Sequence, residues 1–390
     1  MRPGGTMSSS SMLPVAGSGV VNDPLSDFAR WVFRSMPRVD QRRWAEVYLR
    51  GLLFLDGRKS VRKMAESILS LPVSQSLQQF INQSPWDWTP IRSQLAHFLG
   101  SQMENQAWVV SPAVIPKRGS HSVGVVRQFI PKEGRMINCQ LGLGLFMTNA
   151  TTIAPVNWRL LLKGKWAHDE DARAKVYLPD SVRGRPEWRE ILSMVDQSIG
   201  RWQLPPAPIV AHVPDPVAAR ELVDALDVRG LNYVLRVSES FRDLVQDQFV
   251  RSQRSKVLVG GEGARESGRL PPLLGTLEFP VGHQSTSVLI PLAGPRGKAS
   301  YGNRVIRLIR ERRRHSPGTQ KLWITNMTQA RLDDVMYVAS LADRSTQAVR
   351  LLESNFGLQD FEGRSFRGWH HHITMVSAAW TYQQVYGGLE

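Results

Sequence analysis

A strand–helix–strand pattern in the middle of the chain constrains the fold more than any other feature. The apolar run Pro208–Ala211 ends at His212, a helical pattern occupies 216–228, and a second apolar run follows at Tyr233–Val237. Short apolar runs bounded by turn residues indicate buried strands, and the apolar spacing between them indicates a helix. A helix between two such strands, after an upstream β meander, predicts an α/β core.

Further strand and helix patterns flank this unit. Upstream, Pro and Gly turns separate β-type runs, which predicts a three-strand meander, and a polar helical stretch follows it over 186–200. Near the end of the chain come another strand, a long helix and a loop rich in Gly, Arg and His. The meander strands are expected at Trp108–Val110, Ser122–Val126 and Ile137–Phe146, the late strand at Leu322–Thr325, the long helix at Leu332–Phe356 and the loop at 361–365 and 368–372.

The patterns divide the chain into five segments. A Ser-, Gly- and Met-rich start has little periodicity, which indicates a disordered tail. Helical spacing then predicts a helical domain, and a less regular stretch with strand-like pieces at 275–280 and 286–291 interrupts the α/β core as a β-rich insertion. The segments are the tail at 1–23, the helical and candidate DNA-binding domain at 24–104, the core at 105–237, the insertion at 238–319 and the rest of the core at 320–390.

The charge balance points to a polyanionic partner. Lys and Arg total 49 against 34 Asp and Glu, a formal net charge of +15. Nucleic acid is the first candidate. The alternative is an Arg-rich background composition without any DNA contact.

Two basic runs concentrate this charge. One is in the helical segment at Arg58–Lys63, and the other extends from Arg304 to Arg314. The spacing of the second run predicts that most of its arginines lie along one side of a strand or helix, where they could follow a DNA backbone. A solvated charged face is the alternative for both runs.

Cysteine content and hydropathy bear on the compartment. The single cysteine, Cys139, excludes an internal disulfide and favours a reducing compartment, and its place in a strand pattern indicates a buried structural thiol. No apolar run approaches the roughly 20 residues of a membrane helix, and the start lacks a signal-peptide pattern. A cytoplasmic protein without a membrane partner is expected.

Several longer blocks, in their order along the chain, resemble an insertion-sequence DDE transposase of the insertion-sequence family 701 type. The resemblance extends from about Arg42 to Thr374 and implies an RNase H-like core with a mixed sheet. The blocks are Arg43–Gly51, Ser76–Phe80, Gln83–Trp88, Asn157–Leu160, Phe361–Ser365 and Gly368–His372.

The resemblance also implies where two catalytic acids should be. Such transposases bind two divalent metal ions through carboxylates, Mg²⁺ being the expected cofactor. The first family Asp opens an Asp-Asp-Thr motif between a Trp-led strand and Pro-Lys, and this frame holds Ser111 between Trp108 and Pro116. The second family Asp ends the buried strand, where this chain has His212. Histidine nitrogen suits zinc or iron better than magnesium.

The third family acid is a Glu on the last long helix. Counting back from Gly357 without a gap places Thr346 at that position, and Val349 at the position of a family tyrosine. Neutral hydroxyls bind magnesium weakly. The loss of about three negative charges also makes the cleft that holds the metal ions in the family more attractive to phosphate. The sequence thus predicts no metal and no DNA cleavage, unless Asp215, Glu353 or Glu362 substitutes for the missing acids.

Three readings of function follow. The first is a domesticated, catalytically inactive transposase-like protein that binds DNA, with a homodimer as a further option. The second is an enzyme of another class that uses His212 as general base or metal ligand on a small molecule, and the third is a relic without a role. Under the first hypothesis, the triple histidine has either a structural or a DNA-contacting role. The residues expected to contact DNA are Arg58, Lys59, Arg62, Lys63, Lys117, Arg118, Arg304, Arg307, Arg310, Arg312, Arg313, Arg314, Arg364, His370, His371 and His372.

Overall fold

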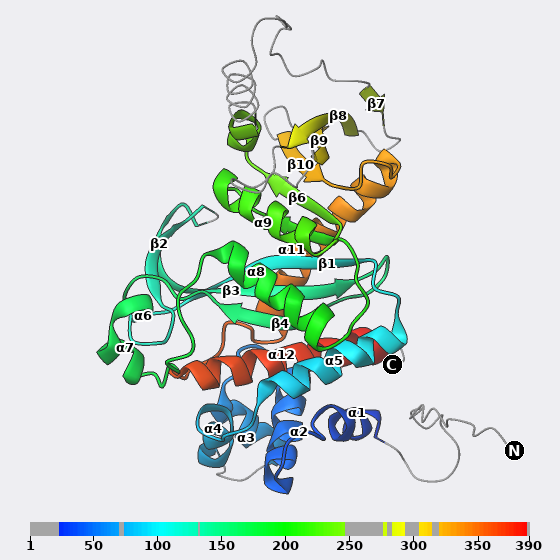
Figure 1. The fold of residues 1–390 in the computed structure, drawn as a ribbon. Coiled ribbons are helices and arrows are strands. Elements are labelled where there is room, and N and C mark those ends of the chain that lie inside the picture. Colours follow the sequence, from blue (N-terminus) through cyan, green and yellow to red (C-terminus); the bar gives the residue numbers. More distant parts are fainter. Residues whose placement is uncertain are drawn as a thin grey trace, which may run out of the picture.

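A single mixed sheet forms the centre of the molecule in the computed structural model (Figure 1). The structure describes residues 23–69, 74–131, 133–245, 276–278, 283–292, 304–313 and 320–387. The strand order is β2-β3-β1-β5-β6-β10-β9-β8-β7, and β4 also pairs with β3. The strands are β1 (Ala107–Pro116), β2 (Val126–Ile130), β3 (Arg135–Thr148), β4 (Ile153–Leu160), β5 (Ile209–His212), β6 (Tyr233–Val237), β7 (Thr276–Glu278), β8 (His283–Leu292), β9 (Arg304–Arg313) and β10 (Gln320–Thr325).

Five strands, in the order β4-β3-β1-β5-β6, carry the core of the sheet. β3 is antiparallel to both β1 and β4, whereas β1, β5 and β6 run parallel to one another. β1 and β5 are apolar over most of their length because helices cover both faces of the sheet at this point. This mixed α/β architecture confirms the predicted fold class.

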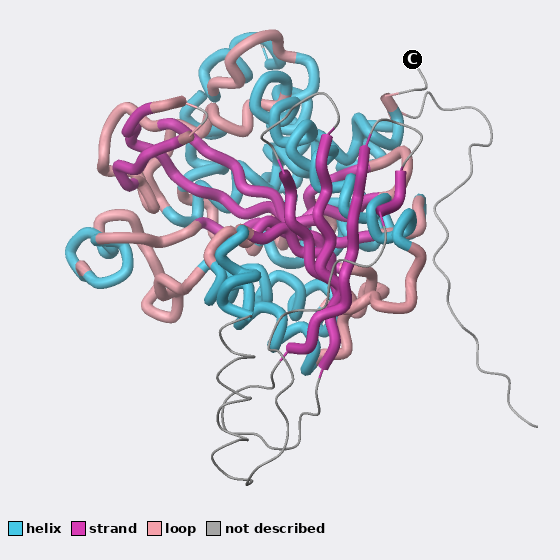
Figure 2. The backbone as a smooth tube through the Cα atoms, turned by 90° about the horizontal axis from the view of Figure 1, so that it is seen from above, coloured by secondary structure: helices cyan, strands magenta, loops and turns pink. Residues whose placement is uncertain are grey.

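Helices cover the two faces of the sheet unequally. α8 (Glu187–Val195) and α9 (Pro216–Val228) pack together on one face, and α11 (Leu332–Asn355) crosses the other (Figure 1). Figure 2 shows helices on both sides of the strands. α9 begins at Asp215, whose carboxylate accepts a hydrogen bond from the Ala218 amide, and Pro216 fits the first helical position. Three short helical segments complete this part of the chain: α6 (Lys165–His168), α7 (Glu170–Ala174) and the π-helical η1 (Asp196–Arg201), which follows α8 directly.

The N-terminal helices pack around the last helix of the chain, α12 (Phe366–Tyr386). α12 contacts α2, α4 and α5 on one side and β4 on the other, and every residue from Gly368 to Thr381 is buried. The C-terminal helix therefore packs into the core of the N-terminal helical part of the chain. The N-terminal helices are α1 (Pro24–Val32), α2 (Val39–Phe54), α3 (Val61–Leu69), α4 (Ser74–Asn82) and α5 (Trp88–Gln102).

Two local predictions were wrong. The loop expected over 368–372 is the start of α12, because the Ser365 hydroxyl caps the Gly368 amide and the apolar residues that follow supply a helix buried on all sides. The second meander strand is Val126–Ile130, and residues 122–125 form a bend in which Gly124 has a positive φ of 73°. Its partner strand β3 carries Cys139, which is buried as expected.

The strands of the predicted insertion continue the central sheet. β9 pairs with β10 and β8 with β9, all antiparallel. Within the described residues, no helix is long and apolar enough to cross a membrane.

Candidate functional site

Two of the three positions expected to hold catalytic acids lie side by side on parallel strands. Val109 of β1 pairs with Val210 of β5, so two residues further along each strand Ser111 falls opposite His212. Paired residues project from the same face of a sheet. Ser111 is only 3% exposed, whereas His212 is exposed at the end of its strand.

The third position, Thr346, lies on α11, which packs against β1 and β5. Thr346 is half-buried at the rim of the packed face of this helix. Its hydroxyl donates a hydrogen bond of 3.1 Å to the Ala342 carbonyl, and the buried Ser345 hydroxyl donates to the same oxygen at 2.8 Å. The fold thus brings the three positions onto three elements in mutual contact.

These three side chains do not fit a pair of hard divalent cations. Two alcohols and an imidazole offer no negative charge, and such cations take carboxylate and other oxygen ligands. Partial burial, with a smaller contribution from the neighbouring Arg236 guanidinium, lowers the pKa of His212 and keeps its ring neutral near pH 7. Among the described residues, no group of three or more His, Cys, Asp or Glu side chains could hold a metal ion.

The three acids considered as substitutes have other places in the fold. Asp215 caps α9, and Glu362 forms an ion pair with Arg58 at 2.8 Å on the surface. Glu353 lies two turns beyond Thr346 on α11, about 10 Å further along the helix axis. Within the described residues, these carboxylates therefore form no group of three or more that could hold a metal ion.

The basic run at Arg58–Lys63 divides between surface and interior. Lys59 is only 5% exposed, and its ammonium group donates to the Leu55 carbonyl, so the prediction that it contacts DNA was wrong for this folded form. Arg58 and Arg62 are exposed, but Arg62 pairs with Glu66 in the next turn. Lys63 is exposed.

Lys117, Arg118 and Arg364 lie near the loop that joins the core to α12. The Lys117 ammonium group donates to the Phe361 carbonyl at 2.5 Å, and burial lowers its pKa to about 8. Arg118 and Arg364 are exposed. The Val123 amide donates to the Arg364 carbonyl, which ties the two loops together.

Of the described arginine side chains of β9, Arg304 and Arg310 belong to one face of the strand and Arg307 to the other. Alternate residues of a strand project from opposite faces. Arg304 forms ion pairs with Asp224 and Asp227 of α9, whereas Arg307 projects to the other face and donates to the Ala330 and Thr328 carbonyls.

Among the remaining arginines of this run, the structure describes the side chain of Arg310. Arg310 lies 3.6 Å from Glu239, so its charge also has a protein partner. Arg314 and the side chains of Arg312 and Arg313 lie outside the described residues.

The triple histidine is interior. His370, His371 and His372 are 3%, 0% and 1% exposed, so the prediction of DNA contact was wrong for all three. The His371 ring stacks on Trp86 with centroids 3.6 Å apart, and its nitrogens face the Ile81 and Trp86 carbonyls. Burial lowers the pKa of His371 to about 3.

His372 has a complete set of partners in its neutral form. Nδ1 lies 2.8 Å from the Tyr48 hydroxyl and Nε2 lies 2.9 Å from the Gly357 carbonyl, so the hydroxyl donates to Nδ1 and Nε2 donates to the carbonyl. Burial lowers the pKa of His372 to about 4. This histidine therefore joins α2 to the loop before α12 as a neutral group.

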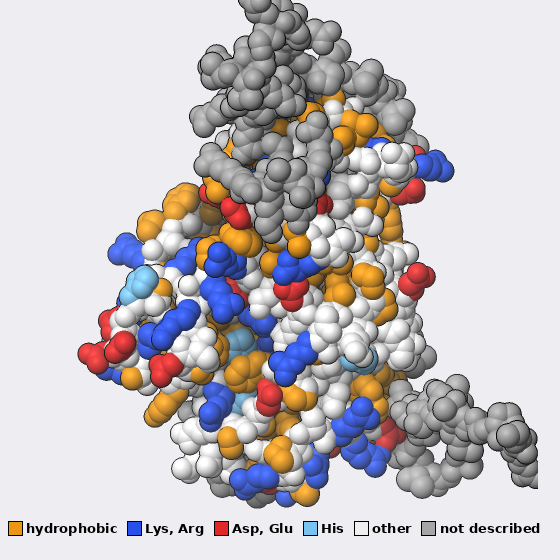
Figure 3. All heavy atoms as spheres, in the orientation of Figure 1, with side chains coloured by type: hydrophobic (Ala, Val, Ile, Leu, Met, Phe, Trp, Pro, Cys, Tyr) orange, Lys and Arg blue, Asp and Glu red, His pale blue; other side chains and the backbone are white. Residues whose placement is uncertain are grey.

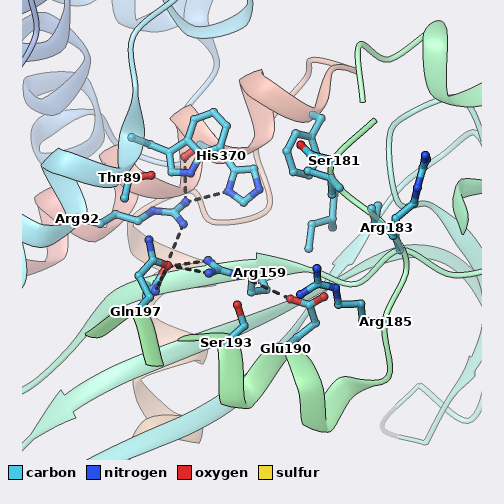
Figure 4. Close-up of a pocket in the computed structure, with 16 residues that line it drawn as sticks. Thr89, Arg92, Arg159, Ser181, Arg183, Arg185, Glu190, Ser193, Gln197 and His370 are labelled. Carbon is cyan, nitrogen blue, oxygen red and sulfur yellow. Dashed lines mark hydrogen bonds and ion pairs between the residues drawn. The ribbon is translucent and has the colours of Figure 1, made fainter. Parts of the chain in front are cut away.

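A pocket that the sequence analysis did not identify lies between β4, α5, α8 and α12. Its volume is about 260 Å³, and it is lined by four arginines, Arg92, Arg159, Arg183 and Arg185, and by a single glutamate, Glu190 (Figure 4). Figure 3 shows Lys and Arg side chains gathered over the part of this face that carries α6 and α8. We call this feature the arginine pocket. The one signal in the sequence was the Arg183-Gly184-Arg185 triplet, which has no helix or strand periodicity.

The five-strand order and the helix that carries the third position define an RNase H-like nuclease fold. The family model described as "DDE superfamily endonuclease" matches residues 32–272, more than half of the chain, and includes Ser111 and His212. The chain belongs to this family. No curated protein matches it.

Proposed function

We propose that this protein is a transposase-derived DNA-binding protein, of the insertion-sequence family 701 type, that does not cleave phosphodiester bonds. One observation supports the proposal: Ser111, His212 and Thr346, which the resemblance assigns to the family's three acid positions, lie on three elements in contact. Without carboxylates, the site cannot hold two metal ions beside a scissile phosphate. The closed position of Ser111 gives a phosphodiester no access to that residue.

Net charge and exposed basic residues support binding to DNA. The chain carries a formal charge of +15, and Lys63, Arg118 and Arg364 keep exposed side chains. Beside Ser111, the exposed His212 is neutral and lies next to Arg236. The His212 side chain therefore presents no negative charge that would repel a phosphate. Phosphate contacts of this kind bind DNA without reading its sequence.

A salt titration of duplex binding tests the first half of the proposal. We expect binding of a short duplex at low ionic strength, with log K falling linearly with log salt concentration. Replacing Arg118 and Arg364 by Gln should reduce that slope by about 1 to 2, roughly one for each lost phosphate contact. A matched pair of exposed arginines, Arg201→Gln and Arg331→Gln, serves as control, and absence of binding at low salt would sink the proposal.

A nicking assay tests the second half. The wild-type protein should leave supercoiled plasmid intact in the presence of Mg²⁺ or Mn²⁺. Metal-dependent nicking that persists in a Ser111→Ala, His212→Ala variant would show that other acids form an active centre. Nicking that this variant loses would show that the present residues support catalysis. Either result contradicts the proposal.

A further inference from the structure

The arginine pocket has the chemistry of an anion site. Its walls come from four elements: Thr89 and Arg92 on α5, Arg159 on β4, Glu190 on α8 and His370 on α12 (Figure 4). The loop that carries Arg183 and Arg185 completes the rim. Four guanidinium groups against one carboxylate leave an excess of positive charge within a small volume.

Arg92 contributes a buried charge that forms no ion pair with any described carboxylate, Asp87 acting on it only at longer range. The residue is 1% exposed, and its guanidinium donates only to neutral acceptors. It donates to the Thr374 hydroxyl at 2.8 Å, the Asn157 side chain at 3.3 Å, the Trp158 carbonyl at 2.9 Å, His370 Nδ1 at 3.1 Å and the His370 carbonyl at 3.3 Å. A buried cation that is fully hydrogen-bonded but not ion-paired raises the electrostatic potential of the adjacent pocket.

The hydrogen bond between Arg92 and His370 determines which ring nitrogen of His370 can donate to a ligand in the pocket. Arginine has no acceptor atom, so His370 Nδ1 must accept from Arg92, and the neutral ring carries its proton on Nε2. Within the described part of the chain, Nε2 has no partner, although the residue is only 3% exposed and lines the pocket. Figure 4 shows one ring nitrogen turned to Arg92 and the other away from it.

Arg183 and Arg185 are the accessible cations of the pocket. Both are exposed, and neither has a carboxylate within salt-bridge distance among the described residues. Gly184 holds their loop close to the domain, because a β-carbon at this position would lie 2.5 Å from the Leu162 carbonyl oxygen. The loop backbone therefore approaches the core at the point where its two arginines flank the opening.

Arg159 is the remaining arginine of the wall and has a partial counterion. Its guanidinium lies 3.7 Å from Glu190 and donates to Gln197 at 2.7 Å. Burial raises the pKa of the Glu190 carboxyl, whereas the positive charges of Arg159 and Arg185 lower it and favour the carboxylate. One carboxylate thus faces two arginines, which leaves donor capacity for a ligand.

We propose that the arginine pocket binds the phosphate group of a phosphate monoester. Guanidinium groups match phosphate oxygens in bidentate geometry, and a monoester dianion takes more donors than a backbone diester. A volume of about 260 Å³ accommodates such a head group. The monoester could be the terminal phosphate of a nucleic acid strand or a free mononucleotide.

The arginine pocket is separate from the old catalytic positions. Asn157 and Arg159 project from β4 toward α8, and the residue of β1 in register with Asn157 through β3 is Val110. Ser111, the next residue, projects from the opposite face. The inference therefore does not rest on DNA binding at the old site and can hold if that proposal fails.

Calorimetric titration of the full chain with inorganic phosphate tests the pocket. We expect saturable binding, weakened about tenfold or more in an Arg183→Gln, Arg185→Gln variant, because each loses a charge-assisted hydrogen bond. The control removes two exposed cations of the same region that do not line the pocket, Lys175→Gln and Arg189→Gln, and should change affinity less than twofold. No phosphate binding at millimolar concentration, or an equal loss in the control, would overturn the proposal.

Competition experiments distinguish the two sources of the monoester. Displacement of phosphate by a 5′-phosphorylated oligonucleotide but not by its 5′-hydroxyl form would assign the pocket to strand ends. Displacement by adenosine monophosphate, without an effect of the phosphorylated oligonucleotide, would assign it to free nucleotides. Failure of all three competitors to displace phosphate would contradict the monoester proposal.

Discussion

The old catalytic positions and the arginine pocket lie on opposite faces of one sheet, and they differ in how the fold treats charge. At the first, Ser111, His212 and Thr346 carry no charge; Ser111 is buried, and the Thr346 hydroxyl is bonded to its own helix. At the second, Arg92 remains buried with all of its donors in use. The difference indicates that the framework around β4 uses a hydrogen-bonded buried charge, whereas the contact between β1 and α11 carries neutral side chains at Ser111 and Thr346.

The largest effect is expected at Arg92, where the comparison can be broken most directly. Replacing Arg92 by Met should lower the free energy of unfolding by about 3 kcal/mol or more, because buried acceptors at Asn157, Trp158 and His370 lose their donor. Denaturant unfolding measures this loss. Arg189→Met, on the exposed side of α8, should change stability by no more than about 0.5 kcal/mol. Equal stability of both variants would remove the structural role assigned to Arg92.

The pH dependence of stability tests whether the buried histidines of α12 are neutral in the folded protein. The pKa of His372 is about 4 in the folded protein, whereas the unfolded chain has a value near 6.5, so the unfolded state takes up a proton first. Stability that is complete above pH 6.5 should fall as pH drops to 4, by about 1.4 kcal/mol per pH unit, or roughly 3 kcal/mol in total.

Substitution isolates this contribution. Unfolding curves measured between pH 7 and pH 4 should be less steep in pH for His372→Gln than for the wild type. The exposed His97 provides the control, and His97→Gln should keep the wild-type dependence. An unchanged dependence in His372→Gln would contradict a neutral, buried role.

Restoring acids to the cleft gives a smaller effect. A Ser111→Asp, His212→Asp, Thr346→Glu variant should gain about 1 kcal/mol of stability at a Mg²⁺ concentration roughly five times its dissociation constant. The isosteric amide variant, Ser111→Asn, His212→Asn, Thr346→Gln, should show no gain, and neither should the wild type. A metal response in the wild type would mean that the present residues do bind the cation.

The smallest effect is expected at the loop of the arginine pocket. Gly184→Ala should weaken phosphate binding about threefold, because the added carbon pushes the loop away from the Leu162 carbonyl and displaces both flanking arginines. Gly200→Ala is the matched control, since a β-carbon at Gly200 meets nothing within 4 Å. Calorimetry that finds equal affinities would show that the position of the loop is unimportant.

The sequence predicted regular elements well and tertiary partners poorly. Helix Pro216–Val228 and strand Tyr233–Val237 were placed with their observed bounds, because apolar periodicity and a proline at the helix start are local signals. The family blocks also located Ser111 and His212, which the sheet register brings together.

What the sequence could not show was the direction of a side chain in the folded molecule. The Arg304 to Arg314 run predicts a basic face that holds most of its arginines, but Arg304 and Arg307 lie on opposite faces of β9 and both have protein partners. The triple histidine reads as polar, yet α12 is enclosed on all sides. The arginine pocket joins residues from distant segments, so no window of sequence contains it.

The position of α12 has a consequence for how the protein is made. Four helices near the start of the chain, α1, α2, α4 and α5, pack against a helix that begins at Phe366, so the faces that contact it have no partner while the ribosome is still translating the sheet. A stop codon or frameshift anywhere upstream of Phe366 would expose those faces in the truncated product. Such a product should aggregate or be degraded rather than persist as a free helical fragment.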